Sequence, residues 1–501
     1  MASRRDELNA YTFAKKRLVA AFLQPTPSGT EEGAPRPLRA VLPGVIIGVV
    51  IMAGFGAWGM FKPKAPEGWD APGEKVIIGS ESTTRYVVLK TDGKKQLHPV
   101  LNLASAKLLL DPDRFEIVEV DEKVLDDGDI PHGATLGIPY APDRLPDDGE
   151  ATTPKRWAVC TRPGAGGTVE KAAFVLSDRD KGRVDGKNRL RGGEVMYVEG
   201  PDSQRYIVDR AGKAFPVADD PKLLRTVVGQ TKPQRVGADW LKTVRTGDTV
   251  GFPEMPPNLG ADAGVGGGLP PAAARVGTVL RATSGGSAQH YVVLEGEVRP
   301  VSDFMAQLLL NAPEATELGQ HGKATEVSAG AFEASGEEYR ASRDWPEEIA
   351  RTVNGDGDRE TLCNVLRDVD EEGDLTLSTW AADAYPATLP NGATSAYVSP
   401  GSGLLFRQVK GDDLSSGGVF LVTDTGLRYA VQANTDSGED ASGIGSDGEK
   451  DEQSATSDGN RAAIRLGYQD AQPVPVPASW SQFLPTGPRL STSAAKQPQG
   501  S

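Results

Sequence analysis

The sequence contains few of the residues that build metal and nucleophile sites, with two cysteines and four histidines in 501 residues. No C-x-x-C pair occurs, whereas a zinc site needs several such ligands close together. No G-x-x-x-x-G-K-[ST], G-x-S-x-G or H-E-x-x-H motif is present, so the standard phosphate loop and the common hydrolase signatures are missing. A catalytic triad assembled from distant residues leaves no such signature and stays open. We therefore predict no metal site and assign no catalytic residue.

A basic excess is also missing. Lys+Arg number 54 against 69 Asp+Glu, giving a net charge of -15, whereas a general nucleic-acid-binding protein carries an excess of bases. Gly and Pro number 59 and 37, about a fifth of the chain, so long helices should be scarce. This composition excludes coiled coils, collagen and helical solenoids. It predicts an α+β protein rich in short strands and turns.

Several stretches imitate binding loops without completing them. The glycine clusters at 164–168 and 260–268 have no Lys-Ser/Thr pair. The acidic stretch at 354–365 has Arg359 where a calcium loop needs glycine, and the stretch at 368–379 has Thr379 where the bidentate Glu belongs. The histidines are scattered, and we assign packing or surface roles to all four: His98, His132, His290 and His321.

One segment departs from the polar average, although the mean hydropathy is -0.36. Residues 40–61 carry no charge, and 22 residues at about 1.5 Å each cross a hydrocarbon core of roughly 30 Å. Trp58 suits the headgroup region, and Lys62 and Lys64 end the run. A buried core helix and a signal peptide are the alternatives, but 39 residues precede the run, which is too many for a signal peptide. The sequence therefore predicts one transmembrane helix.

The flanking charges predict the orientation of this helix. Residues 1–39 hold seven bases and four acids, net +3, so the remainder carries -18. By the positive-inside rule the N-terminus is cytoplasmic and the chain from Lys62 onward lies outside, in a single-pass protein of the cell membrane. Gly44 and Gly48 have the spacing that lets another membrane helix approach closely.

The N-terminal segment from Ser3 to Gln24 has helical periodicity, and Pro25 follows it. Basic residues accompany the large apolar ones, which predicts an amphipathic helix that binds anionic lipid or a partner groove. A merely solvated helix is the alternative. The residues expected to make these contacts are Leu8, Tyr11, Phe13, Leu18 and Phe22.

The two cysteines, Cys160 and Cys363, lie in the predicted extracytoplasmic part, where an oxidising compartment permits a disulfide. A bridge would close a loop of 203 residues and stabilise the fold by roughly 5 kcal/mol through chain entropy. Two buried free thiols are the alternative.

Four stretches share a hairpin pattern, in which an aliphatic strand, a polar turn and a second strand precede an apolar helical stretch. The hairpins begin at Arg85, Arg205, His290 and Val419, and a further strand precedes each. We predict four repeats, each a three-stranded sheet with one helix. Repeats of this kind build a binding or scaffold surface.

The intervals between equivalent aromatic residues of these hairpins are 120, 85 and 129 residues, and each longer interval contains one cysteine. This indicates a β-rich core built from two separate segments, within an elongated extracytoplasmic region. Repeat 4 is expected to contain a disordered acidic insert at 434–460. The predicted boundaries are repeat 1 at 74–128, core segment A at 129–191, repeat 2 at 192–252, a flexible Gly/Pro linker at 253–273, repeat 3 at 274–335, core segment B at 336–401, repeat 4 at 402–490 and a disordered tail at 491–501.

Specific blocks carry a family resemblance over nearly the whole chain. They are S-R-R-D-E-L-N-A-Y-T-F-A-K-K-R-L at the N-terminus, A-T-L-G-I-P-Y-A-P-D at 134–143, W-A-V-C and L-C-N-V around the cysteines, and P-V-P-V-P-A-S-W near the C-terminus. With the early span, these blocks resemble the EccB family, a membrane component of actinobacterial type VII (ESX) secretion systems. The acidic insert departs from that pattern.

The resemblance implies a disulfide-linked periplasmic core and repeats similar to a phage-lysin cell-wall-binding module. It also implies assembly with EccC, EccD, EccE and a mycosin protease. The leading hypothesis is a scaffold subunit of the inner-membrane secretion complex. The alternatives are an anchor that grips peptidoglycan through the repeats, and an extracytoplasmic ATPase, because family members are sometimes described as ATPases. We expect no cofactor other than ATP in this last alternative, for which the sequence identifies no binding residues.

Overall fold

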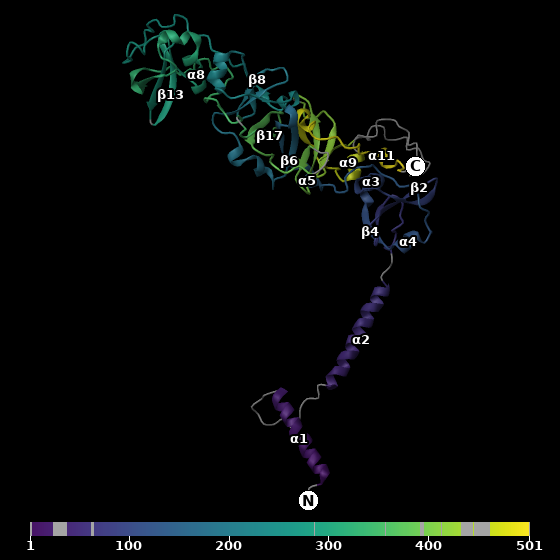
Figure 1. The fold of residues 1–501 in the computed structure, drawn as a ribbon. Coiled ribbons are helices and arrows are strands. Elements are labelled where there is room, and N and C mark those ends of the chain that lie inside the picture. The colour runs from purple at the N-terminus through teal and green to yellow at the C-terminus, as the bar shows by residue number, and fades with distance from the viewer. Residues whose placement is uncertain are drawn as a thin grey trace. The chain divides into compact units, whose positions relative to one another are not determined.

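The structure, a computed structural model, describes residues 3–23, 38–61, 65–284, 286–355, 357–390, 395–411, 413–431, 444 and 461–499. The chain divides into two compact units, Met1–Glu67 and Gly68–Ser501. The described residues of the first unit form two helices, and those of the second form the β-sheets (Figure 1). The predicted mixed α+β class with a helical N-terminus is therefore confirmed.

The first helix, α1 (Arg4–Leu23), begins with a capping pair. The Ser3 hydroxyl accepts from the Arg5 N–H at 3.3 Å, and the Ser3 N–H donates to the Asp6 carboxylate at 3.2 Å. The prediction of an amphipathic helix is wrong, because the apolar and charged residues are not separated onto two faces. At about 100° per residue, Lys15 falls on the same side as Leu8 and Phe22, while other apolar residues lie elsewhere around the helix.

The second helix, α2 (Leu38–Phe61), covers the predicted span at 40–61 and contains Pro43. Among the helices in the described parts of the chain, none is both long enough and apolar enough to cross a membrane.

Four sheets of the second unit share one topology. In the first, β1 (Lys75–Gly79), β2 (Arg85–Thr91) and β3 (Lys94–Pro99) are antiparallel neighbours. The chain then forms α3 (Leu103–Leu109) and returns as β4 (Glu116–Val120), which pairs parallel to β1 and gives the order β3-β2-β1-β4.

The other three repeats contain the same elements in the same order. In repeat 2 they are β7 (Glu194–Glu199), β8 (Arg205–Val208), β9 (Lys213–Val217), α6 (Pro221–Val228) and β10 (Gln234–Arg235). In repeat 3 they are β12 (Val279–Ser284), β13 (Ser287–Leu294), β14 (Glu297–Val301), α8 (Asp303–Asn311) and β15 (Thr325–Ser328). In repeat 4 they are β20 (Gly403–Val409), β21 (Val419–Thr423), β22 (Arg428–Ala430), α9 (Arg461–Leu466) and β23 (Val474–Pro477).

Each repeat thus has a fourth strand, parallel to its first, that the predicted three-stranded unit lacked. Strands such as Gln234–Arg235 and Thr325–Ser328 are short and polar, so they give no alternating apolar signal. Repeat 2 is widened further by β11 (Arg245–Thr246) beside β9 and β16 (Arg351–Thr352) beside β7.

The central sheet joins two segments that repeats 2 and 3 separate in the sequence. β5 (Arg156–Pro163) and β6 (Val169–Leu176) come from the first segment. The second segment supplies β17 (Thr361–Val369), β18 (Leu375–Ala382) and β19 (Ala396–Val398), and the order is β18-β17-β5-β6-β19. β17 and β5 pair antiparallel, so the split lies between two hydrogen-bonded neighbours.

The second unit also contains short helices outside the repeat pattern. The α-helical ones are α4 (Glu122–Asp126), α5 (Asp148–Thr152), α7 (Ala238–Leu241), α10 (Ala478–Ser481) and α11 (Thr492–Ala495). The 3₁₀ turns are η1 (Pro112–Arg114), η2 (Ala165–Gly167), η3 (Lys181–Val184), η4 (Gly186–Asn188), η5 (Pro313–Leu318) and η6 (Ala329–Ala331).

The repeats pack in two pairs, one at each side of the central sheet. α3 of repeat 1 contacts α9 and α11 at the C-terminal end of the chain, and these helices lie together in Figure 1. α6 of repeat 2 contacts α8 of repeat 3. One apolar cluster joins the central sheet to repeats 2 and 4, so the sheet is the element that connects the two pairs.

Two segments are more ordered than predicted. The Gly/Pro linker at 253–273 buries Ala263 and Ala273 against repeat 3, because small side chains let the chain lie close to the sheet. The tail predicted as disordered forms α11, and the Gln499 N–H donates to the Thr135 carbonyl at 2.8 Å. The predicted disorder of the insert at 434–460 falls outside the described residues, apart from the buried Ile444.

Candidate functional site: the disulfide-linked core and its junctions

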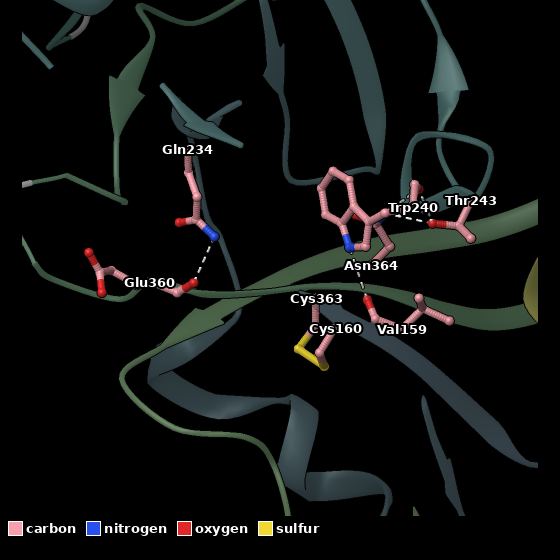
Figure 2. The surroundings of a disulfide bond; sticks show 8 residues. All are labelled: Val159, Cys160, Gln234, Trp240, Thr243, Glu360, Cys363 and Asn364. Atoms are coloured by element: carbon pink, nitrogen blue, oxygen red, sulfur yellow. Dashed lines mark hydrogen bonds between the residues drawn. A yellow bond between two sulfur atoms is a disulfide. The ribbon is translucent and has the colours of Figure 1, made fainter. Parts of the chain in front are cut away.

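Cys160 and Cys363 form a disulfide at the centre of the five-stranded sheet (Figure 2). They are direct partners in the register of β5 and β17, and both are fully buried. On their face of the sheet Phe174 and Trp380 complete an apolar cluster. The bond therefore fastens together two strands that lie 203 residues apart in the sequence.

The opposite face of the same strands receives repeat 2. The Trp240 indole of α7 is fully buried and donates to the Val159 carbonyl at 3.2 Å (Figure 2). The Asn364 amide, next to Cys363 on β17, donates to the Thr243 hydroxyl at 2.7 Å, and that hydroxyl donates to the Trp240 carbonyl at 2.6 Å. Cys363 and Asn364 are successive residues of β17, and successive strand residues point to opposite faces. The disulfide therefore holds β17 on one face of the sheet, and the hydrogen bond of Asn364 holds it on the other.

A carboxylate with two cations fixes the other end of β5 and β17. Asp185 lies 3.0 Å from Arg156 of β5 and 2.6 Å from Arg367 of β17. Burial alone would raise the pKa of Asp185, but the hydrogen bond from Arg367 and the charges of both arginines lower it overall. The loop between β6 and β7 is thereby tied to both halves of the split sheet.

We expect Asp185→Asn to lower the free energy of unfolding by about 2 kcal/mol at pH 7, because two half-buried guanidinium groups lose their shared anion. A carboxyl whose pKa is depressed on folding stabilises the fold above its unfolded value and loses that effect as the pH falls. The difference between wild type and variant should therefore shrink below about pH 4. Urea unfolding at pH 7 and pH 3 measures this.

The matched control is Asp178→Asn, which removes an exposed carboxylate from its contact with Lys181. It should cost less than about 1 kcal/mol at either pH. Equal effects of the two substitutions at pH 7 would contradict the role assigned to Asp185.

At the junction of repeats 1 and 4, a cationic side chain of each helix donates hydrogen bonds to backbone carbonyls at the end of the other helix. Lys107 of α3 donates to the Leu466 carbonyl at the end of α9, at 3.1 Å. In return, Arg465 of α9 donates to the carbonyls of Leu108 and Leu110 at 3.0 and 2.8 Å. Burial lowers the pKa of both cations. Each helix thus satisfies the C-terminal carbonyls of the other, groups that a helix cannot pair internally.

At the junction of repeats 2 and 3, an uncharged amide takes the place of the cation as the donor to a helix carbonyl. Gln307 of α8 holds the place of Lys107 before a similar Leu-Leu-Leu run, and its amide donates to the Thr226 carbonyl of α6 at 2.8 Å. The two pairs therefore meet in a related geometry with different chemistry.

The loop before the central sheet is held by tyrosines of repeat 4. The Tyr429 hydroxyl donates to the Tyr140 carbonyl at 3.1 Å, and the Tyr468 hydroxyl donates to the Pro146 carbonyl at 2.9 Å. Burial raises the pKa of both phenols. These bonds attach the loop that leaves repeat 1 to the last repeat.

The side chains of the stretches that resemble binding loops, and two of the histidines, bind other groups of the protein. The Asn354 side chain is buried and forms two hydrogen bonds with the Tyr197 backbone, at 2.8 and 2.9 Å. Asp370 accepts from the Asp374 N–H within its own turn. The imidazole of His98 is buried beside the Ala134 carbonyl, whereas His290 lies 2.7 Å from Asp303. In the described ranges, no cluster of three or more His, Cys, Asp or Glu is placed to hold a metal.

The predicted contact residues of the first unit all lie on the helix surfaces. Their exposed fractions are 63% for Leu8, 67% for Tyr11, 50% for Phe13, 73% for Leu18 and 90% for Phe22. Around Gly44 and Gly48 of α2, a Cβ atom would meet no described atom within 4 Å. The roles of these residues stay predictions.

The residues that join the repeats to the core were not predicted from the sequence. Trp240 lies in A-D-W-L, and Trp480 holds the corresponding place in A-S-W-S of repeat 4; both are fully buried in the cluster around the central sheet. The signal for this pair is the tryptophan that follows the hairpin and helix at matching positions of repeats 2 and 4. Asp185 and Arg465 carry no local signal, because their partners come from distant segments.

Known proteins are similar to this chain over nearly its whole length. A family model described as type VII secretion system ESX-1, transport TM domain B, matches residues 1–500. The ESX-3 secretion system ATPase EccB3 of Mycolicibacterium smegmatis is 25% identical over 98% of this chain and 90% of its own length. EccB3 of Mycobacterium tuberculosis H37Rv is also 25% identical, over 98% and 88%.

Solved structures show the same fold. A chain in an intact ESX-5 inner membrane complex matches with a TM-score of 0.56 at 20% identity, covering 100% of this chain and 96% of that one. The EccB3 dimer from the ESX-3 core complex matches with a TM-score of 0.54 at 23% identity, covering 84% and 99%. Because the family model matches residues 1–500, this chain belongs to the EccB family of type VII secretion systems.

Proposed function

We propose that this protein is a structural subunit of a type VII secretion inner-membrane complex and supports protein export across the cell envelope. The proposal rests on the central sheet, whose two segments a disulfide joins and which one buried apolar cluster connects to repeats 2 and 4. Such an arrangement maintains surfaces at fixed positions, and the described residues contain no cluster placed to hold a metal. Relatives solved within the ESX-5 complex and as an ESX-3 EccB3 dimer support assembly with other subunits and with a second copy.

The proposal includes the predicted topology. Residues 40–61 would anchor the chain in the membrane, with α1 on the cytoplasmic side and the second unit outside. Support comes from the uncharged run and from the net +3 of residues 1–39. EccC, EccD, EccE and a mycosin are the partners that the family resemblance implies.

The test uses α1, whose apolar side chains are highly exposed. Replacing Leu18 and Phe22 together by serine should reduce both the assembled complex on native gels and substrate export. The matched control replaces Asn9 and Thr12 of the same helix by alanine, which should leave both readouts unchanged. Normal assembly and export in the Leu18/Phe22 variant would contradict a scaffold role for α1.

ATP hydrolysis is the second candidate, because the relatives are named ATPases. The chain has no Walker motif, and its nearest glycine cluster, 164–168, forms the turn between β5 and β6. Purified full-length chain in detergent should show no ATP turnover above a heat-treated sample. Turnover that follows the folded fraction of the protein would favour the enzyme.

A further inference from the structure

Repeat 1 has an open strand at one edge of its sheet. β4 is the last strand in the order β3-β2-β1-β4, and among the described strands it pairs only with β1. Glu116, Ile117 and Glu119 of this strand are exposed, and the exposed fraction of Ile117 is 50%. The edge of a sheet carries unpaired backbone donors and acceptors, which can pair with a strand of another chain.

The hydrogen bonds of β4 show which of its backbone groups face the open side. The Val120 carbonyl accepts from the Ser80 N–H, which directly follows β1, at 3.0 Å. Alternate residues of a strand direct their backbone groups to the same side, so the even-numbered residues of β4 face β1. The N–H and carbonyl groups of Ile117 and Glu119 therefore point away from the sheet.

The corresponding strands of the other repeats are shorter or blocked. β10 has two residues, and β23 has proline at positions 475 and 477, which cannot donate a hydrogen bond. β15 has four residues, and its exposed Glu326 lies 2.7 Å from Arg281 of β12. β4 has five residues and no proline, so it is the longest of the four and the best suited to receive another strand.

The segment that contains β4 is strongly acidic. Residues 111–129 hold nine acids and two bases, a net charge of -7. Glu116 lies 3.1 Å from Lys75, yet 61% of its side chain remains exposed, and Glu119 forms no ion pair with a described residue. The lysines at positions 90, 94 and 95 belong to β2 and β3, away from this edge. A basic strand therefore complements the β4 edge in charge, whereas an acidic strand is repelled.

We propose that the open edge of β4 binds an extended basic segment of a partner protein as an added strand. Backbone hydrogen bonds to Ile117 and Glu119 supply the affinity, and the two side chains select an apolar and a basic residue. A second copy of this chain is a less suitable occupant, because its own β4 carries the same charge. Its basic strand, β3, is already paired at Leu97 with the segment at 131–133.

The experiment uses the full chain in detergent and a capped peptide of about six residues that alternates lysine and valine. The matched probe has glutamate in place of lysine. The basic peptide should bind about tenfold more tightly than the acidic one, with a difference that shrinks at high salt. Hydrogen exchange at the Ile117 and Glu119 amides should slow when the basic peptide binds. A contact through side-chain charges alone would leave these two amides unprotected.

Two substitutions separate the backbone from the charge. Ile117→Pro removes a donor on the open side while keeping the bonds to β1, so the basic peptide should bind about tenfold more weakly at an unchanged melting temperature. Ile117→Thr keeps the donor and should bind within about threefold of wild type. Glu119→Lys should weaken binding about fivefold. Glu333→Lys, which reverses an exposed charge elsewhere in the second unit, should have no effect.

A basic peptide methylated at alternate backbone nitrogens tests the same hydrogen bonds on the unaltered protein, which keeps the experiment decisive if Ile117→Pro fails to fold. The methylated peptide should bind at least about tenfold more weakly. Unchanged affinity of this peptide would overturn the added strand, and equal affinity for the basic and acidic peptides would overturn the charge selection. Absence of binding by the basic peptide would overturn both. These outcomes leave the proposed function intact, because its test concerns α1.

Discussion

Replacing Cys160 and Cys363 together by alanine lowers the free energy of unfolding of the second unit by about 5 kcal/mol. The bond closes a loop of 203 residues that contains all of repeats 2 and 3, so the oxidised unfolded chain loses much of its conformational freedom. Chemical denaturation of the full chain in detergent, wild type against variant, measures the difference.

The native fold should persist in this variant. β5 and β17 are paired at five positions and buried on both faces, and alanine at two of the buried positions removes only the sulfur atoms. Far-UV circular dichroism should therefore match the wild type, while the unfolding midpoint falls. The control is wild type treated with reductant under native conditions, which should keep its bond because both cysteines are fully buried. Equal midpoints for wild type and the double variant would contradict the stabilising role of the bridge.

Trp240→Ala should cost about 4 kcal/mol, because a large, fully buried side chain is removed from the cluster between repeat 2 and the central sheet. The substitution also leaves the Val159 carbonyl without its indole donor. Hydrogen exchange should then accelerate in β5 and β17 more than in repeat 1, since those strands lose their cover. Urea unfolding gives the size of the effect, and hydrogen exchange gives its place.

The fourth repeat provides a matched control. Trp480 occupies the corresponding helix and is equally buried, but its indole nitrogen has no hydrogen-bond partner among the described residues. Trp240→Phe should therefore cost about 1 kcal/mol more than Trp480→Phe, the difference being the hydrogen bond to Val159. Equal costs would mean that the junction depends on packing alone.

Local signals in the sequence account for the hairpins and helices of the repeats. β-branched runs, polar turns and apolar helical stretches recur at Arg85, Arg205, His290 and Val419, and each begins or lies near a strand of the structure. The unequal spacing of those hairpins indicated a split core, because an inserted segment lengthens an interval whatever its fold.

Contacts between distant segments could not be predicted in this way. The fourth strands are short and are stabilised by their neighbours, and the linker and tail are ordered by burying small residues such as Ala273 and Ala495. The hydrogen bonds that Lys107 and Arg465 donate to each other's helices join segments more than 350 residues apart. Neither residue has unusual neighbours in the sequence. The amphipathic prediction for α1 is wrong because the periodic apolar residues share one side of the helix with Lys15.

We propose that this chain is a fixed structural component of a membrane assembly. Native mass analysis of the complex extracted in detergent from the producing cell tests it most directly. We predict that the chain co-purifies with other membrane subunits at a constant integer ratio, and that the complex disassembles when Leu18 and Phe22 are replaced by serine. A chain that is recovered mainly free of other subunits, while secretion proceeds normally, would contradict the proposal.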